Sequence, residues 1–115
     1  MFRQDGDKIY YTSMLLRWVQ NGTMELSEIE ELVNRGADVD TEEDYIHGFY
    51  GGKRSVIISA IITNIKNHGK HNQIVQYLLS KGAKINAQQL NVALDVTKQE
   101  GYTIEVDEFR KNMKG

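Results

Sequence analysis

The chain has 115 residues, 40% of them hydrophobic and 26% charged, a composition typical of one ordinary globular domain. It contains no cysteine, so disulfides and thiolate metal sites are excluded and a reducing compartment is compatible. The longest apolar run is far too short for a membrane span, and the polar start of the chain carries no secretory or transit signal. We therefore expect a cytoplasmic protein without a membrane partner.

The formal net charge of −2 conceals an uneven distribution of charged residues along the chain. Residues 1–44 contain eleven acids and four cations, whereas residues 45–115 contain ten cations and five acids. Within the second part, residues 45–94 contain six cations and no acid. Two interpretations stay open, ordinary solvated helix faces or an acidic end and a basic end that steer a charged partner.

Two helices are predicted in the first third of the chain. A broad apolar face predicts the first helix over Ser13–Asn21, which Gly22 ends. Ser27 predicts the start of the second helix, because Ser27 as N-cap and Glu30 three residues later would form a capping box. This second helix is expected to end at Gly36, since glycine adopts the left-handed conformation at helix ends.

The next segment, Thr41–Arg54, has the sequence TEEDYIHGFYGGKR and is rich in acids, aromatics and glycines. Aromatic residues and arginine dominate the hot spots of protein interfaces, because they bury large rigid surfaces and still form hydrogen bonds. The candidate partner-binding residues are therefore the aromatic, imidazole and basic ones, Tyr45, His47, Phe49, Tyr50, Lys53 and Arg54. The alternative is that these aromatics fold back over their own helices as a small satellite core.

Four further helices are predicted in the rest of the chain. The isoleucine-rich run Ser55–Asn67 predicts a buried helix, because its length favours a helix over a strand, and a partner helix follows from His71 or Asn72 to Lys81. A short apolar helix over Leu90–Val96 is expected to end near Gly101. The final stretch from Ile104 predicts an amphipathic helix whose polar outer face suits a terminal cap.

A nine-residue phrase occurs twice, as LVNRGADVD at Leu32–Asp40 and as LLSKGAKIN at Leu78–Asn86. In each copy an apolar pair closes a helix, a cation follows at the negative end of the helix dipole, and a glycine then ends the helix. Recurrence of such a unit is typical of stacked helix pairs that bury a continuous core between them.

The phrase and its surroundings resemble the ankyrin repeat. Ile74–Ala87, IVQYLLSKGAKINA, is similar to the second helix and following turn of that repeat, and Ser55–Ala60 stands at the position of the family's T-P-L-H-x-A signature. Both proline positions of the signature hold hydrophobic residues, Met14 and Val56, so the resemblance is to a divergent member. A solenoid of the armadillo or tetratricopeptide kind is the competing fold.

The resemblance implies an all-α, ankyrin-like solenoid in a single domain, residues 1–115, with one enlarged finger loop at residues 41–54. About three repeats are expected, roughly residues 8–40, 41–86 and 87–115. Three repeats are near the minimum for stacking, so an open apolar end could pair with another copy, and we expect a monomer or a weak homodimer.

The family's function implies a non-enzymatic protein–protein interaction module that binds a protein partner of unknown identity through its finger loop and concave helix face. A dedicated inhibitor or immunity-type protein is one such class. No cofactor, metal or catalytic residue is predicted, because His68 and His71 have no carboxylate near them in sequence and His47 has no recognisable nucleophile. The alternative is binding of nucleic acid or another acidic partner through residues 45–94, which the acidic pI of about 5.9 disfavours.

Overall fold

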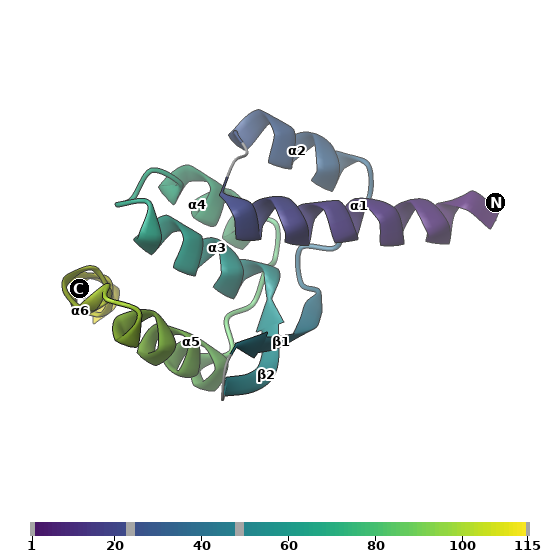
Figure 1. Ribbon diagram of the computed structural model, residues 1–115. Helices are drawn as coiled ribbons and strands as arrows, with labels where there is room; N and C mark the ends of the chain where they lie inside the picture. The colour runs from purple at the N-terminus through teal and green to yellow at the C-terminus, as the bar shows by residue number, and fades with distance from the viewer. Residues whose placement is uncertain (1, 23–24, 48–49, 115) are drawn as a thin grey trace.

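The computed structural model describes residues 2–22, 25–47 and 50–114, with side chains for residues 8–19, 21–22, 25–41 and 55–112. In this part of the chain six helices form three consecutive pairs, and a two-stranded hairpin joins the first pair to the second (Figure 1). The helices are α1 (Phe2–Asn21), α2 (Leu26–Asn34), α3 (Val56–Lys66), α4 (Asn72–Ser80), α5 (Ala87–Gln99) and α6 (Thr103–Lys114). The strands are β1 (Glu42–His47) and β2 (Tyr50–Ser55). The expected helical architecture is confirmed, with a β-hairpin added at the predicted finger.

The three helix pairs are stacked. The first helices of successive pairs pack on each other, α1 on α3 and α3 on α5, and the second helices α2 and α4 are also in contact. The third pair departs from this pattern, because α6 contacts α3 as well as α5. Figure 1 shows α6 almost end-on while α5 lies in the plane of the view, so the last helix runs crosswise to its partner.

Helix α3 forms the centre of the stack. Every side chain from Val56 to Ile62 is at most 3% exposed, and Ile65 in the next turn is buried as well. A helix that is hydrophobic all round must be surrounded by other elements, and α3 contacts α1, α4, α5, α6 and β2. Full burial of each isoleucine contributes about 1.5–3 kcal/mol relative to an exposed one, so this helix supplies a large part of the core energy. The prediction of a buried helix here is confirmed.

Both copies of the nine-residue phrase have the same backbone geometry, at the end of α2 and at the end of α4. The residue after the glycine donates its N–H to the carbonyl five residues earlier, Ala37 to Leu32 (3.0 Å) and Ala83 to Leu78 (3.1 Å). The glycine has a φ of +109° in the first copy and +100° in the second. This conformation favours glycine and satisfies the free carbonyls of the last helical turn, so the two predicted helix ends are confirmed.

Two predicted helix starts are wrong. Helix α1 begins at Phe2 and not at Ser13, because the intervening residues contain no proline and serine is tolerated inside a helix. Helix α2 has Glu25 as its N-cap, whose main-chain N–H donates to the Glu28 carboxylate at 3.2 Å. Ser27 therefore lies inside the first turn, since the Glu25–Glu28 pair caps the helix before Ser27 is reached.

Candidate functional site

The predicted finger, residues 41–54, is a β-hairpin attached directly to the core. Strands β1 and β2 pair antiparallel without interruption, from the Glu42–Ser55 pair to the His47–Tyr50 pair. At the base, the N–H of Val56 donates to the carbonyl of Thr41 at 3.2 Å. Ser55 ends β2, is buried, and caps α3 by accepting a 3.4 Å hydrogen bond from the N–H of Ile58. Because β2 runs without a linker into the buried helix α3, the hairpin is held by the centre of the stack.

The register of the hairpin places four of the six predicted partner-binding residues on one face. Cross-strand partners share a face of a sheet, and successive positions along a strand alternate between faces. The positions on this shared face, called the hairpin face below, are Glu43, Tyr45, His47, Tyr50, Gly52 and Arg54. Lys53 occupies the opposite face as the cross-strand partner of Asp44, and Phe49 lies outside the described residues. The sequence alone did not predict which of these residues share a face. Across the turn, odd-numbered positions of β1 pair with even-numbered positions of β2, and this register is known only from the structure.

Residues 45–94 contain no acid, but cations of this segment lie beside acids from other parts of the chain. The ammonium of Lys66 lies 2.9 Å from a carboxylate oxygen of Glu100. The two cations of β2 are the cross-strand partners of the acids Glu43 and Asp44 on β1. These neighbours reduce the local excess of positive charge that phosphate binding requires.

A surface cleft of about 290 Å³ lies between the base of the hairpin and the start of α5. It is lined by Asp40, Ser55, Lys84, Ile85, Asn86 and Gln89. Asn86 caps α5 by accepting a 3.0 Å hydrogen bond from the N–H of Gln89, and the Asp40 carboxylate accepts a 3.1 Å bond from the N–H of Lys84. Asp40 and Asn86 are the last residues of the two phrase copies, so this signal was present in the sequence although the cleft was not predicted.

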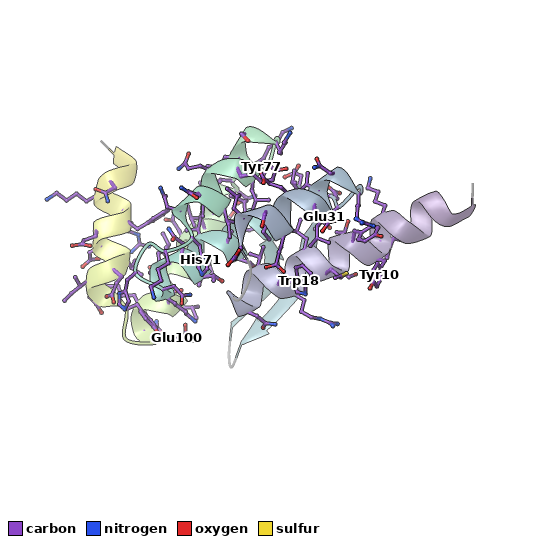
Figure 2. The ribbon with its side chains drawn as sticks, turned by 90° about the horizontal axis from the view of Figure 1, so that it is seen from above. Tyr10, Trp18, Glu31, His71, Tyr77 and Glu100 are labelled. Atoms are coloured by element: carbon purple, nitrogen blue, oxygen red, sulfur yellow. The ribbon has the colours of Figure 1, made fainter. Side chains whose placement is uncertain are left out.

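A second cleft, of about 270 Å³, lies between α1 and α2. It is lined by Tyr10, Tyr11, Met14 and Trp18 from α1 and by Glu28, Glu31, Leu32 and Arg35 from α2. Figure 2 shows Tyr10, Trp18 and Glu31 along this helix pair. Trp18 is half-buried and contributes to the wall of this cleft.

Arg35 organises the rim of the cleft between α1 and α2. Its guanidinium donates to the Tyr11 hydroxyl and to the Glu31 carboxylate, both at 3.2 Å, and lies 5.7 Å from the centroid of the Tyr11 ring. The hydrogen bond to Tyr11, followed by the one to Glu31, raises the pKa of Arg35 above its ordinary value. The guanidinium therefore couples the two helices at the surface.

The first turns of α3 are buried, so they contribute no exposed surface to the predicted concave helix face. That helix is buried from Val56 to Ile62, so a surface built from the first helices of the pairs would be divided between α1 and α5. On α5 the side chain of Val92 is 48% exposed.

The two histidines near the end of α3 have separate surroundings. The Nδ1 atom of His68 lies 3.8 Å from Glu105, whereas His71 precedes α4 and its main-chain N–H donates to Asn64. Among the residues whose side chains are described, no cluster of three or more histidine, aspartate or glutamate side chains is arranged to hold a metal ion.

None of the described helices is long and apolar enough to span a membrane. Comparisons of the chain with protein-family models, with curated proteins and with solved structures find no match.

Proposed function

We propose that the protein is a divergent ankyrin-like module that binds a protein partner through its β1–β2 hairpin and performs no chemistry of its own. The observation that carries the proposal is the register, which gathers Tyr45, His47, Tyr50 and Arg54 on the hairpin face. Two tyrosines, a histidine and an arginine offer rigid apolar surface together with hydrogen-bond donors, the combination enriched at interface hot spots.

The attachment of the hairpin supports the same proposal. Binding costs conformational entropy when flexible segments become ordered, and a preorganised element avoids much of this cost. Strand β2 continues into α3 through the buried cap Ser55, so the partner-facing strands start from the most buried helix of the stack. A hairpin that projects from such a base is suited to recognition of a structured protein surface.

The stack of helix pairs supports an ankyrin-like arrangement, with the hairpin in the place of a repeat finger. The buried α3 and the crosswise α6 are departures from that arrangement. Because α3 is buried, we assign partner binding to the hairpin rather than to the concave helix face. A small module of this kind, with one prominent recognition element, suits a dedicated inhibitor or immunity-type protein.

Paired variants of the hairpin test the proposal. The first carries Tyr45→Ala and Tyr50→Ala on the hairpin face, and the matched control carries Asp44→Ala and Lys53→Ala on the opposite face. Proteins captured from the native source by the unchanged chain and by both variants are compared by quantitative mass spectrometry, and affinity for each captured protein is then measured with purified components.

We expect at least one partner that binds the control with unchanged affinity and the hairpin-face variant about tenfold or more weakly, as for the loss of a hot spot. Circular dichroism confirms that both variants remain folded. A partner that binds both variants equally well would show that recognition lies elsewhere. Binding to DNA or RNA that weakens steeply with salt would favour the alternative of a phosphate-binding surface.

A further inference from the structure

The outer edge of β1, the edge that faces away from β2, has no strand beside it. In the part of the chain that the structure describes, the sheet consists of β1 and β2. Among the described elements, β2 also packs against α3 and α5, whereas the extensive contacts of β1 are all with β2. Figure 1 shows the hairpin at the side of the stack, next to the start of α5. The outer edge of β1 is therefore open to a further strand.

The register identifies the residues of β1 whose main-chain groups point toward this open edge. The N–H of Val56 donates to the carbonyl of Thr41, so these two residues form a hydrogen-bonded pair at the base of the hairpin. In antiparallel strands such pairs alternate with pairs whose main-chain groups point outward. The outward-pointing residues of β1 are therefore Glu42, Asp44 and Ile46. Within the described residues, no main-chain hydrogen bond from another element reaches them.

Two apolar residues of β1 have no side chain directly opposite them on β2. Tyr45 is the cross-strand partner of Gly52, and Ile46 is the partner of Gly51. Cross-strand pairs of side chains stabilise antiparallel sheets, and a glycine offers no side chain to its partner. A hairpin of two strands is marginally stable in water, and further strands add stability. A strand along the open edge would supply the missing side-chain neighbours of Tyr45 and Ile46.

The chain is acidic where β1 begins. Residues 38–44 contain five acids and no cation. The two cations of β2 lie opposite the second and third acids of β1, whereas the first acid, Glu42, lies opposite the uncharged Ser55. Opposite charges in cross-strand positions are favourable. A strand that places a basic residue beside Glu42 would therefore complement the charge that β2 leaves unbalanced.

A strand from another protein fits this edge better than a second copy of β1 does. If two copies paired through all three outward-pointing residues, Glu42 of each would lie opposite Ile46 of the other, and Asp44 would lie opposite Asp44 of the second copy. Like charges directly opposite each other destabilise a sheet. Charged residues on an edge strand protect it from pairing with copies of itself. The occupant that suits this edge is therefore a basic segment of a different protein.

We propose that β1 binds an extended segment of a partner protein as a third, antiparallel strand, through the main-chain groups of Glu42, Asp44 and Ile46. The segment carries apolar side chains beside Tyr45 and Ile46 and a basic residue beside Glu42. In this mode of recognition main-chain hydrogen bonds supply affinity and alternate side chains supply specificity. The antiparallel direction is the more stable one per residue. The proposal rests on the proposed function, since it names what the hairpin recognises.

A labelled synthetic peptide, Thr-Val-Tyr-Gln-Thr-Lys, tests strand addition to the full chain. Paired antiparallel with β1, it sets its valine beside Ile46, its glutamine beside Asp44 and its lysine beside Glu42. Fluorescence anisotropy measures binding. We expect a dissociation constant below about 1 mM, and binding about fivefold weaker when glutamate replaces the lysine. No binding at about 1 mM overturns the proposal.

Methylation of single main-chain nitrogens in the peptide separates strand pairing from general charge attraction. An N-methyl group on the glutamine, which faces Asp44, removes a donor to β1. An N-methyl group on the tyrosine is the matched control, because the N–H of that residue points away from β1. We expect the first change to weaken binding about tenfold more than the second. Equal effects of the two changes contradict pairing through the edge of β1.

Two variants at one position separate failure of this proposal from failure of the proposed function. Ile46→Pro removes an outward-pointing N–H, and Ile46→Ala removes the same side chain but keeps the N–H. Neither removes a hydrogen bond between the strands, and circular dichroism checks that both variants are folded. For a partner whose binding depends on Tyr45 and Tyr50, we expect Ile46→Pro to bind about tenfold more weakly than Ile46→Ala.

The outcomes with the captured partners are distinct. Equal binding of a partner to folded Ile46→Pro and Ile46→Ala would overturn strand addition and leave the hairpin as the partner-binding element. If no captured partner depends on Tyr45 and Tyr50, the proposed function fails, and this proposal fails with it.

Discussion

Thr63 on α3 donates a hydrogen bond of 2.7 Å from its hydroxyl to the main-chain carbonyl of Val19 near the end of α1. The carbonyls in the last turn of a helix have no partner within the helix, so a side chain from the next helix pair satisfies one of them. The bond is buried, and it joins the first two helix pairs at a point where both are in the core.

Thr63→Val is expected to destabilise the protein by about 1–3 kcal/mol, because the substitution keeps the shape of the side chain but leaves the buried Val19 carbonyl without this partner. Urea denaturation measures the loss. Thr97→Val is the matched control, since the buried Thr97 hydroxyl bonds the carbonyl of Ala93 in its own helix, which the helix also satisfies. Equal losses for the two variants would contradict the proposed role of Thr63.

Gly22→Ala is expected to destabilise the protein for two reasons. Its φ of +69° is unfavourable for alanine, and an added Cβ would lie 2.7 Å from the Cγ2 methyl of Thr63. Backbone strain and overpacking each cost about 1–3 kcal/mol. Thr63→Ser removes that methyl and keeps the hydroxyl, so Gly22→Ala should cost about 1 kcal/mol less in a Thr63→Ser background. A double-mutant cycle by urea denaturation measures this coupling, and additive effects would show that the methyl is not the obstacle.

Helix α6 is expected to depend on one buried side chain more than on its ion pairs. Val106 is fully buried, whereas the pairs Arg110–Asp95 (2.9 Å) and Lys98–Asp107 (3.2 Å) lie at the surface. Val106→Ala should cost about 1.5–3 kcal/mol, and Asp95→Asn no more than about 1 kcal/mol. Hydrogen exchange of the α6 amides and thermal unfolding check both values. Equal effects, or a large loss of stability in high salt, would assign the docking of α6 to charge.

Tyr77 predicts a loss of stability at high pH. Burial, and then the charge of Glu30, raises the pKa of Tyr77 above its ordinary value of 10.0. Tyrosine is neutral when protonated, so a raised pKa in the folded state means that the unfolded chain releases the proton more readily. The contribution is fully present below pH 10 and is lost as the pH rises through the folded-state pKa. Urea denaturation between pH 8 and pH 11 should show a smaller decline for Tyr77→Phe than for the unchanged chain, and parallel declines would contradict the prediction.

The features of the fold that depend on residues close together in the sequence could be predicted from the sequence. The helix ends at Gly36 and Gly82 follow from the conformational freedom of glycine, and the buried α3 follows from an isoleucine run of helical length. The residue types of Thr41–Arg54 also favour a binding element, which stays a prediction. The wrong start of α2 falls where local signals compete, because both Ser27 and Glu25 can occupy an N-cap and only one start is used.

The tertiary structure alone decided which residues meet. The strand register places Arg54 opposite Glu43 and Lys53 opposite Asp44, and helix packing brings Glu100 to Lys66 inside a stretch of sequence that contains no acid. The cleft between α1 and α2 also arises only when α2 folds beside α1. The sequence by itself determined where helices end and which segments are buried, because these depend on backbone conformation and hydrophobic spacing. The surfaces available to a partner depend on contacts between distant segments, which local rules do not specify.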